Sequence, residues 1–268
     1  MGSTQFGKFH DFCRDSTLPV CNLFIRDNQP PNEKYGGCAL TGINLSSGRH
    51  IGNLDPIRFH ITLLHRHLLD TVFNMAVGKK KGCSRTKGFS AAHVAAICAT
   101  AWLLLLNAIV GYQLIDDGTA VSLGLLVTSA LILFVGTGYI ALDTAFAWTD
   151  RFQSSHRTPN QNIGLYILYL LFPLICIVGF FLLETFLVVK VLKEKRPMLY
   201  LSIAGLLFAL SQIFQFVIST HLCNATDGKI NGAFFETLFN LGAVNMVWVF
   251  WSSITEDDWP MNVGGAYS

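Results

Sequence analysis

The chain has 268 residues, of which 51% are hydrophobic and only 13% are charged, and its mean hydropathy is +0.45. Soluble domains average about 25% charged residues, so this composition excludes an ordinary soluble domain and indicates a membrane protein. The formal net charge of +2 is too small to indicate binding to nucleic acid, and the basic residues stand in short clusters beside apolar stretches.

Residues 1–55 form a polar, loop-rich segment, in which the stretch DNQPPNEKYGG has the composition of turns. The beginning of this segment includes His10, Asp11 and Arg14 and lacks a continuous apolar core. It therefore does not have the pattern of a cleavable secretory signal, and we expect membrane insertion to rely on internal spans.

Residues 56–88 are anomalous, because apolar residues at helical spacing are interrupted by two arginines and Asp70. Each such charge costs roughly 2.5–3.5 kcal/mol at the centre of a membrane helix, so we expect at most an interfacial amphipathic helix here. His60, His65 and His67 form a cluster, but His65 lies well round a helix from the other two. A solvated cluster is favoured over a metal site, and no metal or other cofactor is predicted.

Five long apolar stretches fill the rest of the chain, at residues 89–114, 120–142, 163–189, 198–220 and 231–251. Each is about long enough to cross the hydrocarbon core as a helix, which takes roughly 20 residues. Helices are expected because an isolated strand would leave backbone groups unpaired in lipid. The predicted fold class is all-α, a polytopic transmembrane bundle of about five spans over residues 89–252, followed by an acidic tail over residues 253–268.

The charges of the loops predict the orientation of the spans. The most basic loop within the bundle contains Lys190, Lys193, Lys195 and Arg196. Placing it in the cytosol puts the acidic tail there too, and puts residues 1–55, 150–162 and 221–230 in the lumen or outside. The basic run at residues 79–87 then falls on the non-cytosolic side, against the positive-inside rule. The alternative is that one of the five stretches does not span.

The chain has seven cysteines, of which Cys98 and Cys176 lie within spans and are expected to pack there. Four others lie in segments that this orientation places in an oxidising lumen: Cys13, Cys21, Cys38 and Cys223. These four could form disulfides or remain free thiols, and the sequence does not give the pairing.

Two glycosylation sequons begin at Asn44 and Asn224, both on the predicted lumenal side. Asn44 is the better candidate, because Asn224 is very near the membrane. In the tail, Glu256, Asp257 and Asp258 form a short acidic run. It resembles a di-acidic signal for leaving the endoplasmic reticulum, and a solvated tail is at least as good an interpretation.

Polar residues within the spans are candidates for function, because they are costly in lipid. Glu184 precedes Lys190 in the third stretch, and we expect it to pair with Lys190 or reach the interface in preference to contacting a partner. The amides in the fourth and fifth stretches are Gln212, Gln215, Asn240 and Asn245. They are expected to hydrogen-bond within the bundle or, as the alternative, to contact the transmembrane helix of a partner.

Three segments share an order and spacing with a known family. They are FGKFHDFCRDSTLPVCNLF near the N-terminus, LLLNAIVGYQLIDDGTAVSLGLL in the centre and SQIFQFVISTHLCNATDGKINGAFFETLFNLGAVNMVWVFWSSITEDDW near the end. The first has two cysteines around Leu18-Pro19, and the last includes Cys223, Gly232 and Asn240. Over about residues 5–50 and 89–260, the chain resembles the fungal chitin synthase export chaperone family.

The resemblance implies a protein of seven spans with a lumenal N-terminus, whereas here the first two spans are replaced by residues 56–88. The family's cysteine-containing motif before its first span also has no match, since GINLSSGRHI stands there. Loss of an even number of spans preserves the orientation of the others. Our hypothesis is that residues 56–88 arise from an altered reading frame, a splicing difference or a gene-model error.

The chain lacks the sequence motifs of a Walker loop, a nucleophile elbow, a zinc protease or a dinucleotide site, and we predict that it is not an enzyme. The resemblance implies a membrane chaperone that assists the folding of a chitin synthase and its export from the endoplasmic reticulum, with the catalytic subunit of the synthase and the lipid bilayer as partners. It implies a place in the endoplasmic reticulum membrane, with later secretory compartments or the plasma membrane as further locations. The alternative is a multi-pass transporter or receptor-like protein with a small ligand, which would need a polar cavity near the midplane.

Overall fold

The computed structural model describes residues 6–16, 18–24, 43–44, 50–51, 83–112, 119–149, 151–152, 160–193, 195–227, 230 and 232–255. These residues are almost entirely helical, and five of their helical spans are long and apolar enough to cross a membrane. The predicted all-α bundle of five spans is therefore confirmed. Three spans are single helices: the first is α4 (Cys83–Val110), the second is α5 (Ala120–Phe146) and the fifth is α10 (Gly232–Thr255). The third span is made of four consecutive segments, α6 (Ile163–Tyr166), η3 (Ile167–Leu171), α7 (Phe172–Phe186) and η4 (Leu187–Leu192). The fourth is made of three, α8 (Arg196–Ile213), η5 (Phe214–Ile218) and α9 (Ser219–Ala225).

The first span begins earlier than predicted, because α4 starts at Cys83 rather than at residue 89. Residues 83–88, which the sequence placed in the anomalous segment, continue the helix of the span. The rest of that segment, with His60, His65 and His67, lies outside the described residues.

Local chemistry explains several helix boundaries. The side chain of Thr119 accepts a hydrogen bond from the backbone N–H of Ser122 and so caps the beginning of α5. The same helix ends where Ala147 adopts the left-handed conformation, with φ of 52°. In the third span, Pro173 has no N–H to donate to the preceding turn, which accounts for the π-helical turn η3 just before it.

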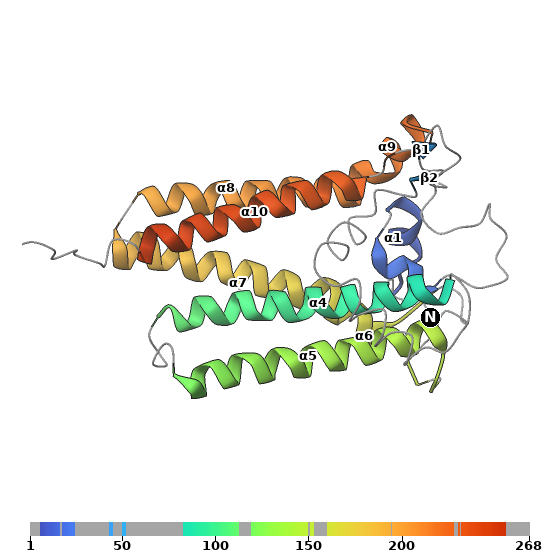
Figure 1. Cartoon of the computed structure of the whole chain (residues 1–268), viewed down its shortest axis with the longest axis horizontal. Helices are drawn as coiled ribbons and strands as arrows, with labels where there is room; N and C mark the ends of the chain where they lie inside the picture. The colour runs from blue at the N-terminus through green and yellow to red at the C-terminus, as the bar shows by residue number, and fades with distance from the viewer. Residues whose placement is uncertain are drawn as a thin grey trace, which may run out of the picture.

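The helices lie side by side in two groups (Figure 1). One group consists of α5, α4 and α7 in that order, and the other is the antiparallel pair of α8 and α10. The α8–α10 pair is packed closely, whereas its contacts with α7 are few. We name the two ends of the bundle by what they carry. The disulfide end has residues 6–24, which include the disulfide between Cys13 and Cys21. The basic end has Lys190, Lys193, Lys195 and Arg196.

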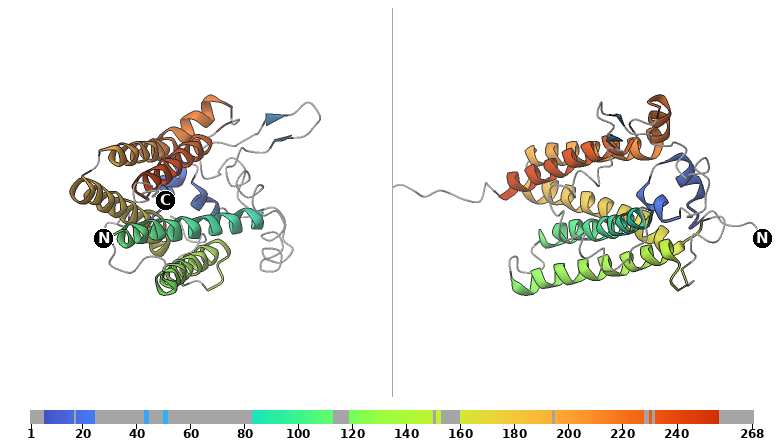
Figure 2. Two further views of the ribbon diagram at one scale, coloured as in Figure 1. Left: turned by 60° about the vertical axis from the view of Figure 1, so that its left-hand side comes forward. Right: turned by 45° about the vertical axis from the view of Figure 1, so that its right-hand side comes forward.

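The N-terminal residues form a compact plug at the disulfide end, made of α1 (His10–Asp15) and the 3₁₀ helix η1 (Pro19–Phe24), as the two turned views in Figure 2 show. The backbone N–H of Phe9 donates to the carbonyl of Asn160 at 3.0 Å, and that of Asn162 donates to the carbonyl of Gly7 at 2.9 Å. A short hairpin follows, in which β1 (Ile43–Asn44) pairs antiparallel with β2 (His50–Ile51), Ile43 opposite Ile51 and Asn44 opposite His50.

Two apolar clusters form the core, one at each end. At the disulfide end, the plug packs on α4, α5, α6 and η3. The ring of Phe12, in the plug, also contacts the ring of Phe216 in η5, with their centroids 6.4 Å apart. At the basic end, buried residues come from both helix groups: Ala108, Phe180, Val188, Leu201 and Phe250. The plug and this second cluster therefore join the two helix groups at opposite ends.

Candidate functional site

The contacts between α8 and α10 set their register. Near the C-terminal end of α8, the hydroxyl of Ser211 donates to Oδ1 of Asn240 at 2.9 Å. At the beginning of α10, the backbone of Gly232 lies so close to Ser219 of α9 that an added Cβ would be 2.8 Å from the Cα of Ser219. Ser211 therefore faces Asn240, and Ser219 faces Gly232.

Gln215 lies midway between Ser211 and Ser219, and Glu236 lies midway between Gly232 and Asn240. Residues four apart share a helix face, so this antiparallel register places Gln215 opposite Glu236. We call the three facing pairs the α8–α10 seam: Ser211 with Asn240, Gln215 with Glu236, and Ser219 with Gly232. It is a polar strip within two apolar spans.

The central pair of the seam has unsatisfied hydrogen-bonding capacity. Gln215 is only 3% exposed, and its Oε1 has no hydrogen-bond partner within the described residues. Glu236 is partly buried, and one of its oxygens accepts a hydrogen bond of 3.4 Å from Nδ2 of Asn240. Tyr169, from η3 in the other helix group, is buried in the apolar cluster against which Phe216 of η5 packs.

The amides predicted as partner contacts occupy different environments. Gln215 and Asn240 belong to the seam, and half-buried Gln212 donates from its Nε2 to the hydroxyl of Ser211 at 3.2 Å. Asn245 instead points outward from α10 among exposed Leu241, Val244 and Trp248. No hydrogen bond to its side chain is present within the described residues.

Glu184 does not pair with Lys190 as the sequence suggested. Its side chain is 0% exposed, and neither carboxylate oxygen has a hydrogen-bond partner within the described part of the chain. Glu184 shares its helix face with Phe180 and Val188, which are both buried in the apolar cluster at the basic end. Lys190 is exposed. A carboxyl sealed among apolar side chains cannot contact a partner unless the helices separate.

The sequence reasoning missed Glu236 and Tyr169. Glu236 had a readable signal, since it is an acidic residue inside an apolar stretch, and such residues face the bundle interior or a partner. Tyr169 had none, because an aromatic residue in an apolar span is ordinary core. Only the folded arrangement places it near the seam.

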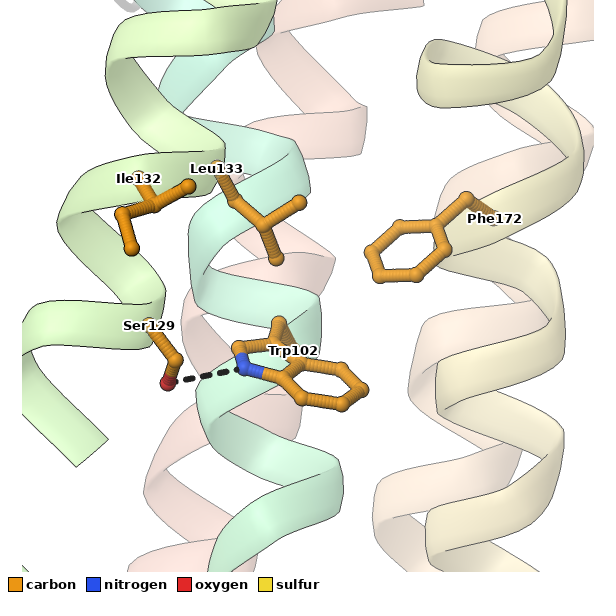
Figure 3. A pocket seen from close by; sticks show the side chains of 5 residues that line it. All are labelled: Trp102, Ser129, Ile132, Leu133 and Phe172. Carbon is orange, nitrogen blue, oxygen red and sulfur yellow. Dashed lines mark hydrogen bonds between the residues drawn. The ribbon is translucent and has the colours of Figure 1, made fainter. Parts of the chain in front are cut away.

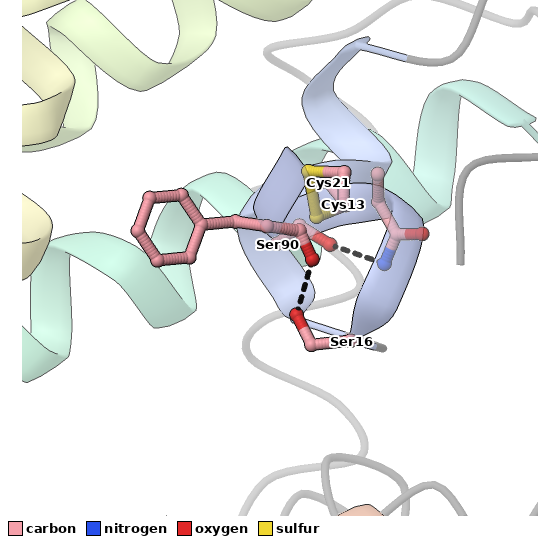
Figure 4. Close-up of a disulfide and its surroundings, with 6 residues drawn as sticks. Cys13, Ser16, Cys21 and Ser90 are labelled. Atoms are coloured by element: carbon pink, nitrogen blue, oxygen red, sulfur yellow. Dashed lines mark hydrogen bonds between the residues drawn. A yellow bond between two sulfur atoms is a disulfide. The ribbon is translucent and has the colours of Figure 1, made fainter. Parts of the chain in front are cut away.

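The plug is closed by a disulfide between Cys13 and Cys21, shown in Figure 4. Nearby, Nδ2 of Asn22 donates to the hydroxyl of Ser90 at 3.1 Å, which ties the plug to α4. Cys223 is disulfide-bonded as well, while Cys98 and Cys176 are buried free thiols. Cys38 lies outside the described residues.

The other predicted sites are only partly described. Asn224 is exposed in the last turn of α9, and the hydroxyl of Thr226 in its sequon donates to the carbonyl of Leu222 at 2.9 Å. Asn44 lies in β1. Glu256, Asp257 and Asp258 lie outside the described residues.

A pocket of about 270 Å³ lies between α4, α5 and α7 (Figure 3). It is lined by Trp102, Ser129, Ile132, Leu133 and Phe172, and the indole N–H of Trp102 donates to the hydroxyl of Ser129 at 3.1 Å. The pocket is apolar and offers no acid, base or nucleophile pair. Within the described residues, no three His, Cys, Asp or Glu side chains are grouped so as to hold a metal ion.

Five apolar spans joined by short connections define a polytopic α-helical membrane protein. The chain belongs to the chitin synthase export chaperone family, whose model matches residues 5–80 and 57–265. The family's name describes a chaperone rather than an enzyme. No solved structure matches the chain.

Curated relatives carry the same description. A chitin synthase export chaperone of Coccidioides immitis is 26% identical over 97% of this chain and 86% of its own length. One from Phaeosphaeria nodorum is 33% identical over 97% of this chain and 85% of its own length. With the protein of Cryptococcus neoformans, the identity is 35% over 66% of this chain, and the match spans 47%, about half, of that relative.

Proposed function

We propose that this protein is a membrane chaperone that assists the folding of a chitin synthase and its export from the endoplasmic reticulum. By doing so it would support chitin synthesis in the fungal cell wall. Membership of the family and the descriptions of the relatives from three fungi support the proposal. The chain acts by contact with the catalytic subunit of the synthase and carries out no reaction itself.

The exposed, outward face of α10 is the feature that best supports a mechanism of direct contact with the client. Only 11% of the most apolar part of this span is buried inside the protein. Asn245 lies on the outward face, past the middle of a helix that runs from Gly232 to Thr255, among apolar side chains. A polar group without a partner costs several kcal/mol in hydrocarbon, so this amide favours a polar partner within the membrane.

The partner in this mechanism is a transmembrane helix of the synthase. Membrane helices associate through close packing and hydrogen bonds between polar side chains, and each such bond contributes about 1 kcal/mol. A client span with a polar side chain would gain from contact with Asn245 until its own neighbours assemble. Such contact would shield the span from aggregation during export.

The site of action that fits this role is the membrane of the endoplasmic reticulum, with the disulfide end in the lumen. The disulfide between Cys13 and Cys21 suits an oxidising compartment. The sequons at Asn44 and Asn224 are then on the lumenal side, and the acidic run at residues 256–258 is in the cytosol as the proposed exit signal.

The function can be tested by following a fluorescently tagged chitin synthase in fungal cells that lack their own export chaperone. Expression of this chain should move the synthase from the endoplasmic reticulum to the cell surface and restore cell-wall chitin. Continued retention, with the chain present at normal abundance, would contradict the proposal. Replacing residues 56–88 by two ordinary spans would then show whether that segment is the cause.

The contact can be tested with the variant Asn245→Leu. It should reduce recovery of the synthase with the chaperone about five- to tenfold in mild detergent, because one interhelical hydrogen bond is lost. A matched control is Ser202→Leu, since Ser202 is also exposed in a span but its hydroxyl already donates to the carbonyl of Met198 at 2.8 Å. Equal recovery with both variants would remove Asn245 from the mechanism.

A further inference from the structure

We propose that Glu236 is a receptor for a basic side chain, lysine or arginine, carried by a transmembrane segment of the client, with Gln215 as the second acceptor. The inference rests on the proposed chaperone function and adds the chemistry of the client residue. The site lies at the centre of the α8–α10 seam, on the face of α10 opposite Asn245.

An ionisable side chain inside a membrane span is costly unless it is paired, faces a cavity or meets a counter-charge. Glu236 forms no ion pair with any of the described residues. Its hydrogen bond from Asn240 satisfies one oxygen, and a cation brought beside the carboxyl would stabilise its ionised form.

Gln215 faces Glu236, is almost completely buried, and has an unpartnered Oε1. The central pair of the seam thus presents a carboxylate and an amide oxygen, both of which accept. A lysine ammonium or an arginine guanidinium has several donors and no acceptor, so it complements both groups at once. A neutral serine or asparagine of a client would not neutralise the carboxylate.

Glu236 is only partly buried, and the seam borders the other helix group, because Phe216, the residue after Gln215, packs against the apolar cluster that includes Tyr169. Contacts between the groups are few along their junction. At its disulfide end is a pocket of about 250 Å³, lined by Asp11, Phe12, Ser16 and Phe216. Phe216 follows Gln215 in η5, so a long basic side chain could approach the seam from this side.

The first experiment measures recovery of the synthase with full-length chaperone variants in mild detergent. Glu236→Gln keeps the size and hydrogen-bonding shape of the side chain but removes its charge. It should reduce recovery about tenfold, whereas Glu184→Gln, which removes a fully buried acid elsewhere in the bundle, should leave recovery unchanged. Equal recovery with wild type and Glu236→Gln would overturn the inference while leaving the chaperone function intact. No recovery with wild type would contradict the function itself.

A second experiment leaves the chaperone unchanged, so that misfolding of a variant cannot explain the result. Each lysine or arginine in the transmembrane segments of the synthase is replaced by leucine in turn. One replacement should reduce recovery by wild-type chaperone about tenfold and cause no further loss with Glu236→Gln, because both changes remove the same pair. If no replacement reduces recovery, or if its effect adds fully to that of Glu236→Gln, Glu236 holds another group, such as a free cation, and the inference is wrong.

Discussion

Gly232 is the residue on which the packing of the seam depends most directly. A Cβ at this position would lie 2.2 Å from the carbonyl oxygen of Phe214 and 2.8 Å from the Cα of Ser219. Both are backbone atoms, which cannot move aside as a flexible side chain could. We predict that Gly232→Ala forces α10 away from η5 and α9 and lowers the free energy of unfolding by about 1–3 kcal/mol, the usual cost of overpacking. Thermal unfolding of the purified protein in detergent would measure the loss.

Gly124 is the matched control for this substitution. It lies in the exposed part of α5, and an added Cβ would meet no atom within 4 Å. Gly124→Ala should therefore leave the melting temperature unchanged or raise it slightly, since alanine is the better helix former. If both alanine variants melt like wild type, the close approach of α10 to η5 is not a feature of the folded protein.

At the scale of elements, the plug is the part whose stability depends on covalent chemistry. Cys13 and Cys21 are separated by 8 positions, and the loop they close carries buried Leu18 and Val20. Opening a loop of this size lowers stability by about 2–3 kcal/mol in the chain-entropy model. Cys13→Ser, Cys21→Ser and the double variant should lose stability to a similar extent, because each removes the same bond. Protease cleavage near the N-terminus, under non-reducing conditions, would report the opening of the plug.

Cys98→Ala is the control for the plug, since Cys98 is a buried thiol outside any disulfide. It should leave the N-terminus resistant to protease, whatever small packing loss it causes in α4. A plug that stays resistant in the double serine variant would mean that its apolar contacts with α4 and α5 suffice to hold it.

The elements differ in how far sequence could predict them. Hydropathy predicted all five spans, because a length of apolar residues is a local property. It did not predict that α4 begins at Cys83, nor that Phe9, Leu23 and Phe24 of the polar N-terminal segment are buried against the bundle. Burial of that kind depends on which helix ends meet, and no local pattern encodes it.

The candidate site was predictable in part for the same reason. The amides of the fourth and fifth spans were recognisable as costly polar groups, but the sequence did not say which of them face each other. The register of α8 and α10 places Gln215 and Asn240 inside the seam and leaves Asn245 outside it. Glu236 becomes significant only when the register of the two spans places it opposite Gln215.

At the scale of the whole molecule, the orientation of the bundle in the membrane decides which side each of its two ends faces. The plug, the ends of α5 and α9 and the beginnings of α6 and α10 all lie at the disulfide end, while Lys190, Lys193, Lys195 and Arg196 lie at the other. Because one bundle carries all of them, a single orientation in the membrane decides the side on which each lies. The positive-inside rule predicts that the basic end faces the cytosol.

Glycosylation mapping would test this orientation. After Asn44 and Asn224 are changed to glutamine, a new acceptor sequon with a flexible spacer is inserted either between residues 153 and 159 or after Lys193. We expect an endoglycosidase-sensitive glycan only on the first protein, because only the disulfide end should reach the glycosylation machinery of the lumen. The reverse pattern would invert the bundle and move the proposed exit signal into the lumen, where it could not act. Glycans on both proteins would show that the third span, which lies between the two insertions, does not cross the membrane.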